Sequence, residues 1–340
     1  MKRIVLTFLL LSIPLAGIAQ QTNEELHPVQ TKPTMNLHSI MQTLVTVPLG
    51  KNDADVTFAA KRFRLILVGE VLPGKIGYQF QGEGLNEKFL LDMFFKFKGY
   101  VPHTTLNVGR ALTSFSLYQP LSTGNLDFIN YPFTTSKFAQ WRQVGFWSET
   151  AVDPFKVTLG LYNGADVPDN WTDNNNAKDM FGRVDYSLLD GETSLKMALY
   201  GWYGYRYARM TIALAKEKDL PLKRLGGFVS GTFGGFRGAV EYVYGWDDYL
   251  TEPDFNLNSE TKESRAILLQ GMYRLNNVEG LFRYDLYNLF GTSEETWVTA
   301  GINYYIPNSG TMLFLDYVRK MELANDIPND EILLQFQIAF

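Results

Sequence analysis

The sequence predicts an all-β protein: a transmembrane antiparallel β-barrel of sixteen strands, with short periplasmic turns and longer extracellular loops. Three observations predict this fold. The carboxy-terminal segment alternates strictly and ends on an aromatic residue, the amino terminus has the pattern of a secretory signal, and alternating segments are joined by a rhythm of short and long connections.

The last ten residues, 331–340, form the most informative segment. Strict alternation predicts a strand with one apolar and one wet face. Gln335 and Gln337 lie on the face expected to meet water. A soluble strand can alternate in the same way, but it rarely stops on an uncovered edge. A terminal Phe340 is typical of the closing strand of an outer-membrane barrel, where this aromatic residue is part of the signal for the barrel-assembly machinery. The residues expected to face lipid are Ile332, Leu334, Phe336, Ile338 and Phe340.

The amino terminus predicts secretion. Lys2 and Arg3 precede an apolar run, and small residues lead to an expected cleavage before Gln20, so residues 1–19 are predicted to be a signal peptide. A membrane anchor is the alternative, but the run is too short to span comfortably. Residues 20–34 lack periodicity and are expected to form a mobile lead, with the barrel over 35–340. No later stretch reaches the ~18 apolar residues of a transmembrane helix.

Composition agrees with an outer-membrane location. The chain has no cysteine, so a disulfide or thiolate-metal framework is excluded. Aromatic residues and glycine are frequent, as expected for a barrel with lipid outside and water inside. The net charge is −5, or −7 once Lys2 and Arg3 are removed, which argues against nucleic acid as a partner. Outer-membrane lipid is therefore the surrounding partner we expect in the Gram-negative cell.

Alternating segments follow one another along the chain, each near the length that a tilted strand needs to cross the hydrocarbon layer. Residues 36–47 form a weaker first strand, and 205–218 is the other uncertain region, since 210–218 could form a short loop helix. Sixteen strands fit best, and fourteen or eighteen remain compatible with the pattern. The clearest segments are 61–69, 75–83, 89–98, 157–162, 195–199, 240–244, 282–286, 298–304 and 313–317.

The connections alternate between tight turns and long loops, as in outer-membrane barrels. Tight turns are predicted at 73–74, 101–102, 190–191, 234–235, 276–277 and 308–310, where good turn formers occur. Long loops are predicted at about 111–140, 164–177, 204–223, 246–263 and 320–329.

A soluble sandwich or β-helix is the alternative fold, but the long apolar runs or repeat period expected for it are missing. Tyrosine and tryptophan cluster where strands meet loops, which resembles the aromatic girdles at the two membrane–water interfaces. Some of these residues are expected to serve only in ordinary side-chain packing. The clustered residues are Tyr100, Trp141, Trp147, Tyr162, Trp202, Tyr203, Tyr244, Trp246, Trp297, Tyr304 and Tyr305.

Signals for catalysis or cofactor binding are close to nil. The chain has no Gly-x-Ser-x-Gly elbow and no phosphate-binding glycine loop, and its three histidines are far apart, so no cofactor and no metal are expected. Asp166, Asp169, Asp173 and Asp179 could coordinate Ca²⁺. Their spacing does not follow the Ca²⁺-loop pattern, and solvated loop tips are the favoured interpretation.

Charged residues on the wet faces are the informative polar positions. The strand parity places basic residues inside at Arg62, Arg64, Lys75, Lys96, Lys98, Arg183, Lys196 and Arg283. It places acidic residues inside at Glu83, Asp92, Asp185, Glu241, Asp285 and Asp316. Charge in a narrow, low-dielectric tube acts strongly on a passing ion. Cross-strand pairing that merely keeps the lumen wet is an equally good interpretation.

The order of these segments resembles the phosphate-selective porin O/P family of outer-membrane porins. The likeness covers nearly the whole mature chain. The residues that carry it are Lys61-Arg62, Leu106-Asn107-Val108-Gly109-Arg110, Trp141-Arg142, Gly182-Arg183-Val184, Arg283-Tyr284-Asp285, Gly301-Ile302-Asn303-Tyr304-Tyr305, Leu315-Asp316-Tyr317-Val318 and Gln337-Ile338-Ala339-Phe340.

The resemblance implies a homotrimeric porin for small hydrophilic solutes, with the loop at about 112–140 folded inward to narrow the pore. It implies an anion-binding role for Arg62, Arg110, Arg142, Arg183 and Arg283. Strict alternation puts Arg110 beside Val108 on the lipid face, so only a bulge or its place at the rim would turn it inward. The loop carries a single basic residue, Lys137, and the mature chain is acidic. The expected preference for anions such as phosphate is therefore weak to moderate.

Passive diffusion through a fixed pore, with electrostatic bias at the constriction, is the predicted function. No chemical bond is made or broken, so the protein is not expected to be an enzyme. The alternative is a narrow or plugged barrel that acts as an outer-membrane enzyme or ligand-binding protein, which would show no stable ion conductance.

Overall fold

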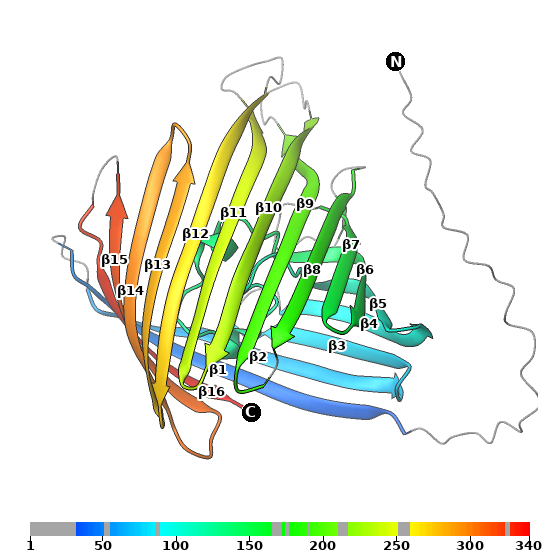
Figure 1. Ribbon diagram of the computed structural model, residues 1–340, viewed down its shortest axis with the longest axis horizontal. Helices are drawn as coiled ribbons and strands as arrows, with labels where there is room; N and C mark the ends of the chain where they lie inside the picture. The colour runs from blue at the N-terminus through cyan, green and yellow to red at the C-terminus, as the bar shows by residue number, and fades with distance from the viewer. Residues whose placement is uncertain are drawn as a thin grey trace, which may run out of the picture. The chain divides into compact units, whose positions relative to one another are not determined.

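Sixteen antiparallel strands close into a barrel in the computed structural model of this chain (Figure 1). The structure describes residues 32–50, 55–85, 89–164, 172–173, 177–189, 191–209, 217–250, 259–323 and 327–340. The predicted signal peptide and most of the predicted lead therefore lie outside the described residues. The barrel occupies a compact unit of residues 33–340.

The strands found among the described residues are β1 (Thr34–Pro48), β2 (Thr57–Leu72), β3 (Ile76–Glu83), β4 (Leu90–Val101), β5 (Thr104–Leu112), β6 (Arg142–Val152), β7 (Phe155–Tyr162), β8 (Asp179–Leu189), β9 (Ser194–Arg209), β10 (Glu217–Phe233), β11 (Phe236–Leu250), β12 (Ser259–Leu275), β13 (Val278–Leu289), β14 (Ser293–Tyr305), β15 (Thr311–Glu322) and β16 (Glu331–Ala339).

Each strand pairs with its neighbours in the sequence, and β1 closes the ring against β16. The closure is sealed by the last residue, because the Ser39 amide donates to the Phe340 carbonyl at 2.7 Å and the Phe340 amide donates back at 3.1 Å. Closure pairs every edge that an open sheet would leave free, as a lipid environment demands. The predicted fold class and the predicted sixteen strands are both confirmed.

Tight turns join the strand pairs at one end of the barrel, and the longer connections lie at the other. Asn276, Asn308 and Gly234 adopt φ values of 54°, 55° and 54° at three of these turns. Asparagine and glycine tolerate this left-handed conformation best, which explains why turn chemistry located these positions in the sequence.

Two predicted long loops are shorter than expected. The region 204–223 is largely strand, since β9 continues to Arg209 and β10 starts at Glu217, and the region 246–263 is likewise shortened by β11 and β12. In the extension of β10 the inward Leu220 and Leu222 are apolar and the outward Lys223 is polar, so the apolar-outward alternation is lost although the pairing continues. Residues 210–216 lie outside the described structure, and Glu217 and Lys218 begin a strand rather than end a helix.

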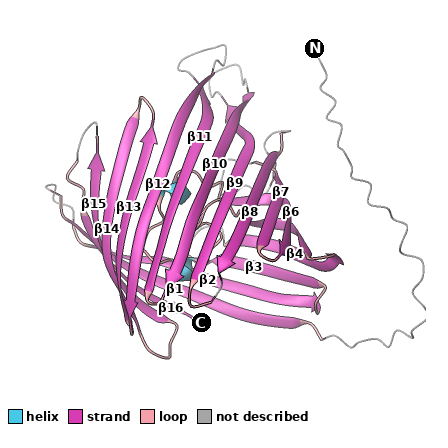
Figure 2. Cartoon of the chain, in the orientation of Figure 1, coloured by secondary structure: helices cyan, strands magenta, loops and turns pink. Residues whose placement is uncertain are grey.

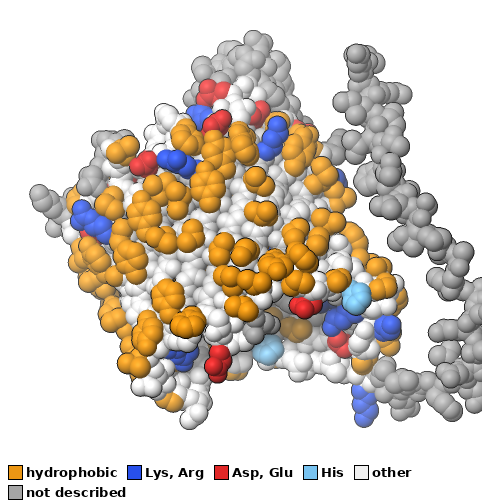
Figure 3. Space-filling view, in the orientation of Figure 1, with side chains coloured by type: hydrophobic (Ala, Val, Ile, Leu, Met, Phe, Trp, Pro, Cys, Tyr) orange, Lys and Arg blue, Asp and Glu red, His pale blue; other side chains and the backbone are white. Residues whose placement is uncertain are grey.

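The outer face of the barrel is an apolar band (Figure 3). On β16, Leu334 and Phe336 are 45% and 39% exposed, whereas Gln335 and Gln337 are 2% and 1% exposed. On β11, the aromatic residues Phe236 and Tyr244 lie eight positions apart on this outer face. At ~3.4 Å per residue and a tilt of about 40°, they mark a band roughly 21 Å high, close to the height expected for a membrane barrel.

The predicted aromatic girdle is correct for only part of its members. Tyr203, Trp246 and Tyr304 lie on the outer face and are 38%, 38% and 40% exposed, and Tyr244 is half-buried on the same face. Three other members, Trp147, Tyr162 and Trp202, have the parity of inward residues and point into the barrel, and they are 7%, 3% and 2% exposed. Their rings form a stacked row with centroids 6.3 and 5.4 Å apart.

A β-bulge alters the alternation near the middle of β2. Gln42 of β1 pairs with Arg62, but the next residue, Thr43, pairs with Ala60, so Lys61 has no partner in the ladder. An extra residue of this kind re-aims its side chain. Lys61, which strict parity would send to the lipid, instead reaches into the barrel, where its Nζ donates to the Ile129 carbonyl at 2.6 Å.

A second irregularity settles the position of Arg110. Gly109 has φ of +132°, and Leu91 in the facing β4 has no partner in the ladder to β3. Arg110 is 1% exposed, and its Nη1 donates to the carbonyl oxygens of Leu90 and Leu91 at 3.4 and 2.8 Å. Its ladder partners Met93 and Val144 share the outward parity of Phe95 and Phe146, so Arg110 keeps the parity of the lipid face while its side chain is buried against the backbone of β4.

Candidate pore constriction

The connection between β5 and β6, residues 113–141, folds into the barrel, and we call it the inward loop (Figure 2). It contains two short helical segments, η1 (Thr123–Asn125) and α1 (Phe133–Ser136). Among the described residues no helix is long and apolar enough to cross a membrane. The loop is an integral part of the interior, because Phe115, Ile129 and Phe138 are each at most 1% exposed.

Aromatic packing holds one side of the inward loop against the barrel wall. Phe115 lies on Tyr200 of β9 with ring centroids 4.9 Å apart, and Phe133 lies on Trp297 of β14 at 4.8 Å. These rings belong to one buried cluster that also contains the row of Trp147, Tyr162 and Trp202. A dry aromatic core therefore fills part of the barrel interior, which removes that part from the aqueous path.

Backbone carbonyls of the inward loop accept hydrogen bonds from basic residues of the wall. Arg183 donates through Nη1 to the carbonyls of Ser114 and Ser116, both at 2.8 Å, and Arg283 donates to that of Asn130 at 2.8 Å. Arg224 of β10 donates to the carbonyl of Phe138. Charge-assisted bonds of this type are stronger than neutral ones. These arginines are thus anchors of the loop.

Backbone amides of the same loop donate to acidic residues of the wall. Glu241 accepts from the Leu117 amide at 2.6 Å, Asp316 from the Ile129 amide at 2.9 Å, and Asp285 from the Phe133 amide at 3.4 Å. The three carboxylates are at most 1% exposed. Acidic and basic residues of the wall therefore both hold the loop by its backbone.

The predicted wet glutamines of β16 belong to this anchoring system. Gln337 donates to the carbonyl of Gly124 at 2.9 Å and accepts from Gln42, and Gln335 accepts from Lys61 at 3.1 Å. The prediction that they face inward is correct, but they meet the inward loop and neighbouring side chains instead of water. The sequence offers no sign of this, because the covering segment is about 200 residues away.

The tip of the inward loop is held by a second polar network. Asp127 accepts from Arg237 at 2.8 Å and from the Tyr118 hydroxyl at 2.6 Å. Arg237 also pairs with the fully buried Glu279 at 2.7 Å, and Glu279 accepts from Tyr305. The loop is thus fixed at its start, its tip and its end.

Three arginines remain beside the aqueous side of the loop. Arg62 and Arg64 come from β2 and Arg142 begins β6, and the guanidinium of Arg62 interacts electrostatically with the other two. We call these three residues the arginine cluster. Tyr131 of the inward loop lies among them, and burial raises the pKa of its hydroxyl. The neutral phenol therefore cancels none of their charge.

Carboxylates balance the arginine cluster only in part. Arg64 pairs with Glu83 at 3.0 Å and Arg142 with Asp92 at 2.7 Å, with side chains 13% and 11% exposed against 3% and 4% for the acids. Arg62 donates to Gln42 at 2.7 Å, and no described carboxylate lies within ion-pair distance of it. The cations are therefore nearer to water than the anions, and the exposed potential is positive.

The other predicted site residues lie apart from this cluster. Lys137 of the loop pairs with Glu295 at 2.8 Å, Lys98 pairs with Glu70 at 2.7 Å, and Lys96 lies over the Phe94 ring. Lys196 is exposed near the tight-turn end of β9. Asp185 pairs with Arg183 at 2.6 Å.

Acidic loop residues give no metal cluster in the described part of the chain. Asp179 accepts from the Trp202 indole at 2.7 Å and from the Tyr205 amide at 2.9 Å, and Asp173 pairs with Lys178. Asp166 and Asp169 lie outside the described residues.

Lys61 and Arg224 are interior residues that the sequence reasoning missed. Lys61 turns inward only through the bulge, which leaves no mark in the alternation. Arg224 directly follows the stretch 204–223 expected to be a loop. Leu225 and Val229 of the same strand are 56% and 46% exposed, so the parity of β10 places Arg224 inside once the start of the strand is known.

Replacing Lys61 with methionine should lower the free energy of unfolding by about 1–3 kcal/mol, because two buried oxygen acceptors lose their donor. Thermal unfolding in detergent, followed by far-ultraviolet circular dichroism, measures the change. Lys137→Met is the matched control: its ion pair is about one-third exposed and is expected to contribute less than ~1 kcal/mol. Equal losses in the two variants would contradict the anchoring role of Lys61.

Comparison with known proteins agrees with this geometry. Residues 34–194 match the family of phosphate-selective porins O and P. The family resemblance seen in the sequence is thereby confirmed. The matched region contains the inward loop, the arginine cluster and Lys61. No curated protein sequence matches the chain.

Solved structures of outer-membrane porins share the fold. The outer-membrane channel DcaP of Acinetobacter baumannii has a TM-score of 0.66 at 12% identity, over 92% of this chain and 98% of that one. An anion-selective porin from Comamonas acidovorans has a TM-score of 0.62 at 16% identity, covering 91% and 100%. The trimer form of OmpT from Vibrio cholerae has a TM-score of 0.63 at 12% identity, covering 91% and 100%.

Proposed function

We propose that this protein is an outer-membrane porin through which small hydrophilic solutes diffuse, with a weak to moderate preference for anions such as phosphate. The family match supports an outer-membrane channel. The observation that carries the anion preference is the arginine cluster, whose guanidinium groups are closer to water than the carboxylates that pair with them.

The mechanism needs no chemical step. The inward loop narrows the path beside the arginine cluster, and the aromatic core fills another part of the interior. An ion that passes the arginine cluster crosses a region of low dielectric constant, where a fixed charge acts over a longer range than in bulk water. Anions are attracted and cations repelled, while the fixed loop sets the size limit. Catalysis has no part in this proposal.

Assembly and processing belong to the same proposal. A homotrimer is supported by the trimer form reported for the OmpT structure, which shares this fold. Removal of residues 1–19 as a signal peptide is supported by the charged start and apolar run of the sequence. Insertion by the barrel-assembly machinery is supported by the terminal Phe340, which also closes the ring.

Planar-bilayer recording tests the proposed function. The purified protein should give steady ion conductance, and a potassium chloride gradient should give a reversal potential of the sign produced by chloride preference. Added phosphate should lower the chloride current if the two anions share the path. A barrel without stable conductance would contradict the porin function, and a reversal potential of the opposite sign would contradict the anion preference.

A further inference from the structure

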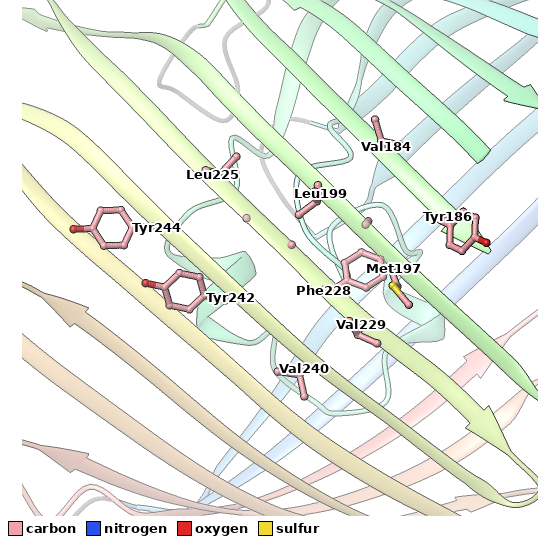
Figure 4. Close-up of a pocket in the computed structure, with 13 residues that line it drawn as sticks. Val184, Tyr186, Met197, Leu199, Leu225, Phe228, Val229, Val240, Tyr242 and Tyr244 are labelled. Carbon is pink, nitrogen blue, oxygen red and sulfur yellow. The ribbon is translucent and has the colours of Figure 1, made fainter. Parts of the chain in front are cut away.

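The outer wall between β8 and β11 contains an apolar hollow of about 640 Å³, which we call the upper hollow (Figure 4). Leu199, Leu225, Val240 and Tyr244 are among its lining residues, and Gly226-Gly227 of β10 adds no side chain to fill it. Its volume lies in the roughly 300–1,000 Å³ range of small-molecule sites. The hollow opens toward lipid, because its lining side chains alternate with inward residues.

The length of the upper hollow corresponds to one leaflet. It extends along β11 from Val240 to Tyr244, which is about 14 Å of strand and roughly 10 Å of height at a tilt of about 40°. This height is half of the roughly 21 Å band between Phe236 and Tyr244. A second hollow of about 560 Å³ continues from Val229 and Val240 toward Phe233 and Phe236 at the tight-turn end. Each hollow therefore faces one leaflet.

Two cations flank the end of the upper hollow that is nearer the long loops. Lys223 lies on the outer face two residues beyond Leu225, in register with Tyr203 and Trp246. No described carboxylate lies within ion-pair distance of Lys223. These residues are at the level of the aromatic girdle, where lipid headgroups begin.

Arg265 is the second cation, and it pairs in register with Tyr244 of the hollow. Its guanidinium lies 5.2 Å from the Phe290 ring centroid, and its Nε is buried without a hydrogen-bond partner. The nearby Glu263 carboxylate accepts a hydrogen bond from the Tyr244 hydroxyl. Neither hollow has a lysine or arginine among its lining residues, so Lys223 and Arg265 lie at the edge of the upper hollow.

We propose that the upper hollow binds an acyl chain of an anionic, phosphate-bearing lipid, whose headgroup is held by Lys223 and Arg265. The backbone positions of the two cations are separated by two inter-strand spacings and an offset of two residues along the strand, roughly 12 Å, so their long side chains can both reach one headgroup. A ligand made only of hydrocarbon would not need the cations at one end of the hollow, and a purely anionic ligand would not need the apolar hollow. Their combination selects one lipid at one site from the surrounding bilayer.

Native mass spectrometry of the detergent-purified protein tests the charge requirement. Phosphatidylglycerol and phosphatidylcholine with the same acyl chains are the probes, and the wild type should retain the anionic lipid more strongly. The double variant Lys223→Gln/Arg265→Gln should bind phosphatidylglycerol about 25-fold more weakly, at about fivefold for each cation near a membrane surface. Arg319→Gln is the control, since this outer-face arginine is already paired with Asp330 at 3.0 Å.

Filling the hollow tests the chain requirement. Val229→Trp should reduce lipid retention at least tenfold, whereas Val108→Trp, on the similarly exposed outer face of β5, should leave it unchanged. Unaltered ion conductance would show that both variants have folded. Equal retention of the two lipids by the wild type, or equal losses in Val229→Trp and Val108→Trp, would overturn the proposal. These outcomes concern the outer face, so they are independent of the channel's selectivity.

Discussion

Replacing Arg283 with alanine is expected to lower the free energy of unfolding by about 3–5 kcal/mol, the usual cost of breaking a buried ion pair. Arg283 is 2% exposed and its Nε lies 2.6 Å from Asp285, which is 1% exposed. The same guanidinium donates to the Asn130 carbonyl and lies 4.5 Å from the Phe128 ring. Alanine would leave a buried carboxylate without its counter-charge and release the middle of the inward loop.

The released loop should also be visible in function. We expect larger and noisier single-channel currents, because the loop would no longer keep one position across the path. Thermal unfolding and single-channel recording measure the two effects. The double variant Arg283→Met/Asp285→Leu is the control: it removes both charges together, so it should recover most of the stability lost in Arg283→Ala. Wild-type stability in Arg283→Ala would refute the anchoring role.

Replacing all members of the arginine cluster with glutamine is expected to lower the anion-to-cation permeability ratio about tenfold. One charge about 8 Å from an ion contributes roughly 0.5–2 kcal/mol for effective dielectric constants between ~80 and ~20. Partial screening and the retained carboxylates Glu83 and Asp92 leave about 1.4 kcal/mol, or one factor of ten, as the combined effect.

Reversal potentials in a salt gradient measure this change. The control removes an equal charge from the outer face with Lys223→Gln, Arg265→Gln and Arg319→Gln, where the barrel wall separates the charge from the path. We expect this control to keep the wild-type ratio. If both triple variants shift the ratio equally, net charge and not the arginine cluster sets the preference.

Several features of the fold could be predicted from the sequence because they depend on local patterns. Alternation with a period of two locates a strand wherever one side meets lipid, as Leu334 and Phe336 do beside Gln335. Glycine and asparagine locate the tight turns because few residues accept positive φ. Alternation predicted no strand at 204–223, because there the inward Leu220 and Leu222 are apolar and 2% exposed while the outward Lys223 is polar, which reverses the pattern found within the membrane.

The roles of the interior arginines could not be separated in this way. Alignment of motifs placed Arg62, Arg183 and Arg283 in one group of expected anion-binding residues. In the structure, Arg183 and Arg283 hold carbonyls of the inward loop, whereas Arg62 belongs to the partly exposed arginine cluster. The position of a residue in the strand alternation predicts that its side chain points inward, but it does not predict which other segment covers that side chain.

The sequence by itself therefore determined the membrane barrel, its strand order and its inward and outward faces, since these follow from alternation, turn residues and the terminal Phe340. Only the tertiary structure decided which inward charges face water. The inward loop crosses the interior and contacts strands up to about 200 residues away, and a bulge turns Lys61 toward it. Contacts between such distant segments depend on packing in three dimensions, for which a local pattern carries no signal.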